Sequence, residues 1–360
     1  MQPDISATGR FVVFASTATN LAPNDTGKYP DIFIRDRVAG TTRLISKGVA
    51  GAEADGASSW PVVSDDGRYV AFRSDATNLV PGDGTRMPGI FRADLTTGAI
   101  IRVSVSTSGQ ANDWWCENLD MSADGRYVVF ATAAGNLVPG DTNRTGDVFL
   151  RDVPEGRTTR VSLTPAGSQQ AARSMQPSIS PDGRLVAFYS MDGPRSINQW
   201  SRATNAVSIV HRDTDVEGYY DVSGRPRVSN AGVSFSRQWY KDAADMTGWA
   251  VSVRNPAGTF RVADDSRGGV LSLVSYDIDR TGRRAVVSVS NGNGREGFIH
   301  IVDRSMDPPN SAAALATLRE PNRQPALAGT APVVAYADNP SRQVMVWNWQ
   351  TGAVTPVSVR

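Results

Sequence analysis

A segment that recurs every 58 residues constrains this chain more than any other feature of its sequence. A turn with a glycine precedes an apolar run at Gly9, Gly67, Gly125 and Gly183, and each is 58 residues after the last. A fixed period of this length indicates a repeat architecture, in which every unit is one supersecondary element that packs against its neighbours. The chain must therefore fold as stacked copies of one small unit.

The third copy shows the content of that unit. Residues 119–122 lead into the Asp124-Gly125 turn, and the apolar run 127–130 follows, then 147–152 and 159–162. Asp-Gly between two such runs is a strong signal for a tight hairpin, because glycine adopts positive φ without steric cost. Each unit is therefore predicted to be a meander of four short antiparallel strands.

Three weaker copies complete the chain. Their turns at residues 232, 282 and 331 follow at intervals of 49, 50 and 49. The second strands carry uninterrupted apolar triplets such as Val12-Val13-Phe14, which predicts sheets that are covered on both faces, as in blades stacked around an axis. We expect an all-β fold, a seven-bladed β-propeller of four-stranded antiparallel blades, as a single domain over 1–360. The expected blades are 1–58, 59–116, 117–174, 175–223, 224–273, 274–322 and 323–360, each of contiguous sequence, with inner strands that begin near Gln2, Trp60, Asn118, Gln176, Arg225, Ser275 and Gln324.

One copy also carries a family resemblance. Gln-Pro-Ser-Ile-Ser-Pro-Asp-Gly-Arg-Leu-Val-Ala-Phe at 176–188 resembles the WD40-like (PD40) repeat of TolB-type β-propellers. The resemblance implies a propeller without implying a chemistry, because propellers host binding and catalysis alike. It also implies an extracellular or periplasmic location, with a signal peptide that is absent from this chain.

Composition narrows the classes of partner. The 37 basic and 36 acidic side chains nearly cancel, so we expect no nucleic-acid partner. One cysteine and two histidines exclude a cysteine- or histidine-rich metal centre, so any metal should be bound by oxygen. No stretch approaches the roughly 20 apolar residues of a membrane span. We expect a monomer.

Long loops on one face of the predicted propeller hold most of the candidate binding residues. Aromatic platforms beside arginines suit a glycan, a peptide or a protein partner. For Trp60, Trp114 and Trp239 the alternative is that they pack between blades. Trp115 and the Tyr219-Tyr220 pair are better candidates for exposure, because neighbours in an extended segment point opposite ways. The full ligand-binding set is Trp60, Trp114, Trp115, Tyr219, Tyr220, Arg225, Trp239 and Tyr276, with Arg227 and Tyr240 nearby.

Two acidic loops are candidate calcium sites. In the first, oxygen ligands surround Gly218 in a pattern that resembles the start of an EF-hand loop, without the flanking helices or a bidentate Glu at its twelfth position. The alternatives are a solvated acidic turn and, for the second loop, a turn in which Asn and Asp cap backbone donors. The first-choice ligands are Asp213, Asp215, Glu217 and Asp221, and the second choice is Asp141, Asn143 and Asp147.

The sequence lacks the familiar catalytic motifs, with no Gly-x-Ser-x-Gly, no His-Glu-x-x-His and no phosphate-binding glycine-rich loop. The expected function is an exported, non-catalytic module that captures a glycan, peptide or protein at the loop-rich mouth of the propeller. The alternative is a polysaccharide lyase or hydrolase in which His211, with Tyr219 or Tyr220, transfers protons and Arg225 stabilises charge.

Overall fold

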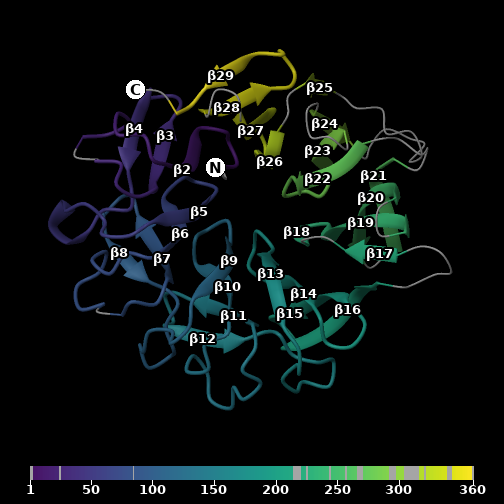
Figure 1. Ribbon diagram of the computed structural model, residues 1–360, viewed down its shortest axis with the longest axis horizontal. Coiled ribbons are helices and arrows are strands. Elements are labelled where there is room, and N and C mark those ends of the chain that lie inside the picture. The colour runs from purple at the N-terminus through teal and green to yellow at the C-terminus, as the bar shows by residue number, and fades with distance from the viewer. Residues whose placement is uncertain are drawn as a thin grey trace.

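Seven antiparallel sheets surround a common axis in the computed structural model of the chain (Figure 1). The structure describes residues 3–23, 26–83, 85–213, 220–223, 226–242, 245–255, 258–265, 271–291, 297–303, 316–319, 322–338 and 343–358. Within these ranges each sheet is formed from consecutive strands, and none contains a strand from the other end of the chain. The predicted seven-bladed β-propeller of contiguous blades is confirmed.

The first four blades follow the 58-residue repeat, and a single 3-10 turn, η1 (Val49–Gly51), lies between the first two. Their strands are β1 (Asp4–Ile5), β2 (Phe11–Ser16), β3 (Asp31–Asp36) and β4 (Thr41–Leu44), then β5 (Ser58–Val63), β6 (Tyr69–Ser74), β7 (Gly89–Asp94) and β8 (Ile100–Arg102), then β9 (Cys116–Met121), β10 (Tyr127–Thr132), β11 (Asp147–Asp152) and β12 (Arg157–Arg160), then β13 (Ser174–Ile179), β14 (Leu185–Ser190), β15 (Ser196–Ser201) and β16 (Ala206–Arg212).

The last three blades have less regular spacing. The fifth contains β17 (Tyr220–Ser223), β18 (Arg227–Ser229), β19 (Gly232–Asp242), β20 (Asp245–Asn255) and β21 (Gly258–Asp265). The sixth and seventh contain β22 (Leu271–Ile278), β23 (Arg284–Asn291), β24 (Gly297–Asp303) and β25 (Ala316–Arg319), then β26 (Asn322–Leu327), β27 (Val333–Asp338), β28 (Gln343–Asn348) and β29 (Val354–Pro356).

The inner strand of the fifth blade corrects one expected boundary. Residues 220–223 were assigned above to the end of the fourth blade, but β17 pairs with β19, the strand that β18 also pairs with. The two short strands together occupy the innermost position of one sheet. Pro226 lies between them and has no N–H to donate, so the ladder is interrupted at this point.

Adjacent blades share their cores, and one cluster joins Val13 of the first blade to Val70 of the second. All six residues of β10 are buried, in agreement with the uninterrupted apolar triplets. Phe14 stacks on Phe33 with ring centroids 5.8 Å apart, and Phe130 stacks on Phe149 at 6.0 Å. Phe72 and Phe91 of the second blade stack at 6.0 Å, so the repeat places one stacked phenylalanine pair at the same point of the first three blades. Aromatic contact there adds to the apolar area that is buried.

The ring closes between the first and last blades. One core cluster includes Phe14 and Val12 from the first blade with Ala335 and Val346 from the last, and the Thr330 N–H donates to the Ala7 carbonyl at 2.8 Å.

No helix in the described part of the chain is long and apolar enough to cross a membrane.

Candidate functional site

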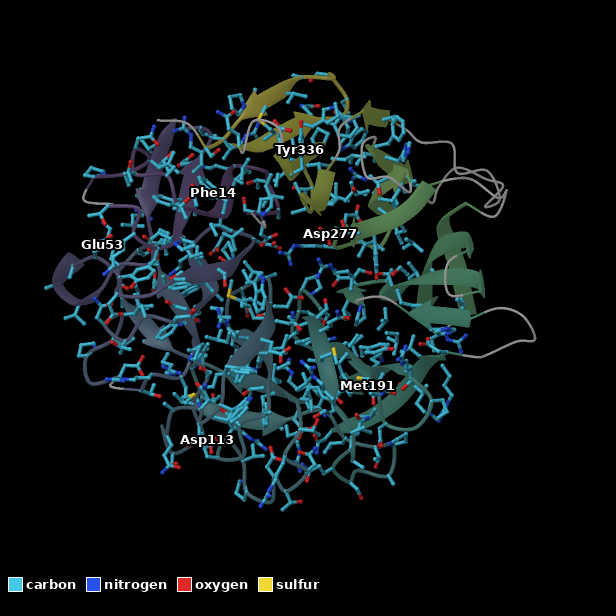
Figure 2. All side chains as sticks on the ribbon, viewed as in Figure 1. Phe14, Glu53, Asp113, Met191, Asp277 and Tyr336 are labelled. Carbon is cyan, nitrogen blue, oxygen red and sulfur yellow. The ribbon has the colours of Figure 1, made fainter. Side chains whose placement is uncertain are left out.

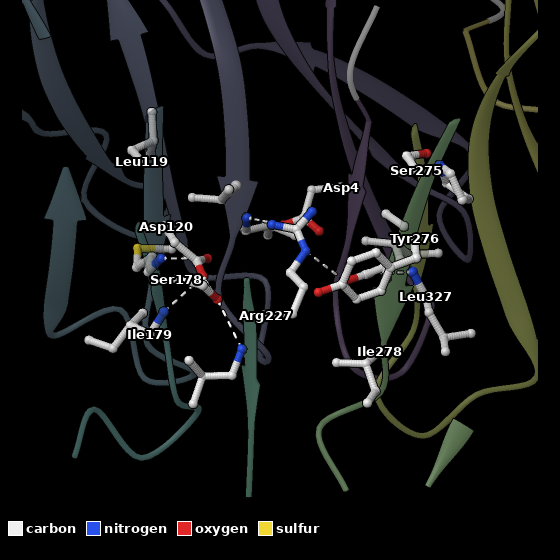
Figure 3. Close-up of a pocket in the computed structure, with 18 of the residues that line it drawn as sticks. Asp4, Leu119, Asp120, Ser178, Ile179, Arg227, Ser275, Tyr276, Ile278 and Leu327 are labelled. Carbon is white, nitrogen blue, oxygen red and sulfur yellow. Dashed lines mark hydrogen bonds and ion pairs between the residues drawn. The ribbon is translucent and has the colours of Figure 1, made fainter. Parts of the chain in front are cut away.

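The inner strands line a central cavity of about 500 Å³. The seven inner strands lie around the axis, and alternate residues of a strand point to the same side. As a result, the same position of the repeat faces the cavity in every blade. Figure 3 shows several of these side chains directed toward the cavity. Around the ring, this position is occupied by Asp4, Val62, Asp120, Ser178, Arg227, Asp277 and Ala326.

The three carboxylates in this set also join neighbouring blades. In each case Oδ2 accepts a hydrogen bond from a backbone N–H of the following blade. The hydroxyl of Ser178 accepts the Val228 N–H at 3.1 Å in the same way and donates to Asp120 at 2.9 Å. The carboxylates are thereby held at fixed points of the cavity wall. The three pairs are Asp4 with Val63 at 2.8 Å, Asp120 with Ile179 at 3.0 Å and Asp277 with Leu327 at 2.9 Å.

The cavity has an unusual charge arrangement. Arg227 Nε lies 3.2 Å from Asp277 Oδ1. Burial raises the pKa of Asp4 to about 7, although the Val63 N–H opposes the shift, and repulsion from Asp277 and Asp120 adds to it. Burial also raises the pKa of Asp277, against the pull of Arg227. Burial alone would lower the pKa of Arg227, but Asp277 and Asp120 outweigh it and hold that pKa above its ordinary value.

Three non-glycine residues at the same repeat position have left-handed backbone and line the cavity. They are Trp60 with φ 53°, Asn118 with φ 40° and Gln176 with φ 53°. Each lies where the register of its inner strand shifts, so each is part of a β-bulge that re-aims the chain. Such conformations are disfavoured by about 1 to 2 kcal/mol per residue, and they concentrate at functional sites.

An ion pair spans the end of the cavity at which the inner strands finish. Arg280, in the β22–β23 turn, lines the cavity and pairs with Asp65, in the β5–β6 turn. These turns belong to the sixth and second blades, which are not adjacent, so the pair crosses the axis. Gly329 gives the arginine room, because a Cβ there would lie 3.1 Å from Arg280 Cδ. The cavity is therefore bridged at the end where the inner strands finish.

The pKa of Asp4 predicts a pH-dependent stability. The folded protein holds this proton up to about pH 7, whereas an unfolded aspartate loses it near its ordinary pKa of 3.8. Folding stability from this group is therefore complete below about pH 4 and declines as the pH rises to about 7. Asp4→Asn keeps an oxygen acceptor for Val63 but has no charge. We expect the advantage of Asp4→Asn over wild type in free energy of unfolding to grow by about 1 to 2 kcal/mol between pH 5 and pH 8. Water in the cavity screens the charge, which makes this value smaller than the pKa shift alone would give. Urea unfolding at both pH values measures this, and a pH-independent difference would contradict it.

A tryptophan pair lies outside the cavity, on the loop between β8 and β9. Trp114 and Trp115 are 47% and 52% exposed, and their ring centroids are 5.3 Å apart at an interplanar angle of 48°. Neither tryptophan is among the described residues that line the cavity. Figure 2 shows the adjacent Asp113 near the periphery and Asp277 close to the axis. The aromatic residues expected at one mouth therefore fall into two places.

Buried hydrogen bonds hold this loop. Asn112 is almost fully buried and donates to the carbonyls of Pro88 and Trp114. Its side-chain oxygen, Oδ1, accepts hydrogen bonds from Arg102 at 2.8 Å and from Ser104 at 2.8 Å. The exposed indole pair therefore lies on a loop whose backbone is held by buried hydrogen bonds.

The other expected binding residues are placed as follows. Trp60 lines the cavity under the guanidinium of Arg73, which is 5.7 Å from its ring, and Tyr276 is buried in the cavity wall. The backbones of Tyr220 and Trp239 lie in the paired strands β17 and β19, while their side chains are outside the described part of the structure. Tyr219 and Arg225 lie outside the described residues altogether.

The second-choice calcium ligands are occupied by protein donors. Asp147 is fully buried and accepts hydrogen bonds from Ser162 and Asn143, and Asp141 accepts from Gln169 at 2.8 Å. These contacts favour a hydrogen-bonded turn. Among the described residues, no group of three or more His, Cys, Asp or Glu side chains could hold a metal ion. Of the first-choice ligands, Asp215 and Glu217 lie outside the described residues, and only the backbone of Asp221 is described.

Calcium binding at the loop 213–221 stays a prediction, which melting curves can test. A cation that binds only the folded state raises the melting temperature as its concentration exceeds the dissociation constant. We expect a higher melting temperature in millimolar calcium than in chelator, and Asp213→Asn should reduce the difference. Curves that overlay in the two conditions would contradict the prediction.

His211, the alternative proton-transfer residue, lies in the outer strand β16. Its ring stacks on Phe235 with centroids 4.8 Å apart, and its Nε2 is 3.9 Å from Asp213. The described part of the structure shows it packed against the neighbouring blade, and it is not a lining residue of the central cavity.

The charged residues of the cavity wall were not identified from the sequence, apart from Arg227, which was placed near the mouth. Asp4 and Asp120 occupy the same position two repeats apart. Two aspartates in register at a cavity-facing position were the available signal. Asp277 is less evident, because the repeat is irregular by the sixth blade.

No family model and no curated protein matches this chain. Solved structures match it through the fold. A prolyl endopeptidase structure aligns over 99% of this chain at 11% identity with a TM-score of 0.64, and this chain spans only 49% of its length. An oligogalacturonate lyase in complex with manganese aligns over 96% of this chain and 87% of its own, at 9% identity and a TM-score of 0.62. TolB from Acinetobacter baumannii aligns over 83% of this chain and 62% of its own, at 14% identity and a TM-score of 0.46.

At these identities the matches show the propeller fold and nothing finer. Two of the matched structures are named as enzymes, so the fold does not choose between binding and catalysis. The resemblance to TolB-type WD40-like repeats is supported only as far as the seven-bladed propeller fold. Its membership in that repeat family stays a prediction.

Proposed function

We propose that the chain is a non-catalytic binding module that captures an extended glycan or peptide, or a protein partner that presents such a segment. The exposed Trp114–Trp115 pair on its fixed loop is the observation that carries this proposal. Indole rings provide a large apolar contact area and lose little side-chain entropy on binding. Because Asn112 and Arg102 already hold the loop, little further ordering is needed when a ligand binds.

The tilt between the rings bears on the kind of ligand. Two indoles 5.3 Å apart and inclined by 48° present a ridge with two differently directed flanks, so an extended ligand can contact both in succession. Sugar rings and peptide side chains both stack on such faces. The proposal includes an extracellular or periplasmic location, where glycans and peptide segments are accessible ligands.

The Trp114–Trp115 pair predicts where binding is lost. Alanine replacement of an aromatic anchor at an interface centre commonly removes 2 kcal/mol or more, so Trp114→Ala and Trp115→Ala should each weaken binding by at least about tenfold. The assay incubates the protein with anionic and neutral polysaccharides and with unstructured peptides. It measures retention on the polymer together with new reducing or unsaturated ends. Met191→Ala, which removes another exposed apolar side chain, should leave retention unchanged.

The same assay separates the two functions. If the protein is retained on a polymer without forming product, and the tryptophan variants are retained less, the binding function is supported. Product formation that disappears in His211→Ala would establish the lyase or hydrolase instead. Retention that survives both tryptophan substitutions would place the ligand elsewhere and overturn the proposal.

A further inference from the structure

We infer that the central cavity is a second binding site, separate from the tryptophan pair, and that it accepts a cationic group on an alkyl chain, such as the ammonium of a lysine side chain. The cavity wall brings together Asp4, Asp120 and Asp277 from three blades, with the Arg227 guanidinium among them. Figure 3 shows Asp4, Asp120 and Arg227 around the cavity. This assignment does not depend on the function proposed for the tryptophan pair.

The charges in the cavity favour a cation. Arg227 pairs with Asp277 at 3.2 Å, and Arg280 at the far end is paired with Asp65. The described wall therefore holds three carboxylates around Arg227, which pairs directly with Asp277 and attracts Asp120 and Asp4 only from farther away. The direct bonds of Asp4 and Asp120 are to backbone N–H groups and the Ser178 hydroxyl. Like charges in a poorly solvated space repel one another, and a bound cation relieves that repulsion.

The shape of the cavity favours an organic cation over a bare ion. Its volume of about 500 Å³ lies within the range of small-molecule sites. The three aspartates come from the first, third and sixth blades, and in the described residues no three such groups converge as metal ligands would. A ligand that meets this wall must therefore bridge a gap that a single ion does not fill.

The remaining wall suits an alkyl stem. Val62, Leu119 and Tyr276 line the cavity and supply apolar contact along such a chain, in the way that lysine stems pack on apolar surface while the charged end meets its partners. The amides of Asn118 and Gln176 also line it and can bond to a backbone amide at the outer end of the ligand. Because the Arg280–Asp65 pair bridges the far end, a side chain can enter to a fixed depth.

N-acetyl-lysine amide tests this assignment, with N-acetyl-norleucine amide as the matched probe that lacks only the ammonium. Titration calorimetry at low salt and at pH 8, above the pKa of Asp4, should show saturable binding of the lysine probe. The norleucine probe should bind at least about tenfold more weakly, which corresponds to about 1.4 kcal/mol. Asp4→Asn and Asp120→Asn, which keep an oxygen acceptor, should each weaken the lysine probe severalfold. Glu155→Gln removes an equal charge from an exposed turn, where the side chain is 68% exposed, and should change nothing.

Other outcomes would overturn the assignment. No saturable binding of the lysine probe to the wild-type protein would do so, and this comparison requires no variant to fold. Equal affinity for the two probes would mean that charge plays no part. Unchanged affinity in the Asp4→Asn/Asp120→Asn double variant, with a wild-type melting profile, would place the cation elsewhere. Loss of lysine binding in Trp114→Ala would assign the probe to the tryptophan pair. Wild-type affinity in Trp114→Ala supports a separate site, whether or not that pair binds a glycan or peptide.

Discussion

Arg102→Ala should destabilise the protein by about 3 to 5 kcal/mol, the usual consequence of leaving one partner of a buried ion pair without its counter-charge. Arg102 and Asp83 have side-chain exposures of 5% and 3%, and Arg102 Nη1 lies 2.9 Å from both carboxylate oxygens. The same guanidinium donates to the Met87 carbonyl and to Asn112. Its removal strands a buried carboxylate and withdraws two donors at once. Urea denaturation with circular dichroism measures the loss.

Arg160→Ala is the matched control, because Arg160 occupies the same position one repeat later. Its Nη1 is 3.5 Å from Asp141, and Asp141 and Asp147 retain hydrogen bonds from Gln169, Asn143 and Ser162 when the arginine is removed. Arg160 Nη1 makes no hydrogen bond to either carboxylate, so we expect a smaller loss there, about 1 to 2 kcal/mol, within the usual range for a single substitution. Equal losses at the two positions would show that the ion pair in the second blade has no special weight.

The Arg102 variant also links stability to binding. Asn112 holds the backbone of Trp114 and receives its own bonds from Arg102 and Ser104. Without Arg102 the tryptophan pair stands on a looser loop, and more ordering must accompany ligand binding. At a temperature where the variant remains folded, its affinity for the ligand of the tryptophan pair should fall, with the lysine probe of the cavity unaffected.

The fold was predictable because the repeat is a local signal that recurs in register. Gly9, Gly67, Gly125 and Gly183 locate the same turn in four blades, and the apolar triplets that follow locate the strand buried on both faces. The inner strands were placed less well. Pairing begins at Ser58, Cys116 and Ser174, two residues before the predicted starts, because each inner strand continues through a bulge at Trp60, Asn118 or Gln176.

The tryptophan pair shows a limit of reasoning from alternation. Adjacent residues face opposite ways only in a regular strand, and Asp113 and Trp114 form a bend before β9 begins. Both indoles are therefore exposed, although one of each neighbouring pair was expected to face the mouth. Residue type indicated a candidate binding residue, but the direction of each side chain depended on a loop conformation that buried Asn112 sets.

The cavity wall was harder to foresee, since its chemistry arises from the closed ring. The position that faces the axis holds Asp, Val, Asp, Ser, Arg, Asp and Ala in successive blades. Along the chain these residues are about 50 to 60 positions apart, and apart from the recurring aspartates their residue types follow no pattern. Ring closure brings them within one cavity, and their mutual electrostatics exist only there.

Gly125→Ala is expected to cost about 2 to 5 kcal/mol, and the reason lies between blades. The glycine has φ +69°, which an L-residue adopts at a cost of about 1 to 2 kcal/mol. A Cβ at this position would also overlap the Tyr69 ring of the preceding blade, and overpacking of this kind costs about 1 to 3 kcal/mol. Tyr69 has little freedom to move, because the guanidiniums of Arg68 and Arg92 lie 4.8 and 4.3 Å from its ring centroid. The same contact recurs one repeat earlier between Gly67 and Phe11.

Gly98→Ala separates the two causes. Gly98 has φ +75° in an exposed turn, and a Cβ there would have no atom within 4 Å, so that variant should lose only the backbone cost of about 1 to 2 kcal/mol. The excess loss in Gly125→Ala then measures the contact between the second and third blades. In a double-mutant cycle, Tyr69→Ala should cost less in the Gly125→Ala background than in wild type, because removing the ring there also removes its collision with the new Cβ. Equal losses for the two glycine variants, with no coupling to Tyr69, would mean that the repeated glycine serves its own turn and not the packing of one blade on the next.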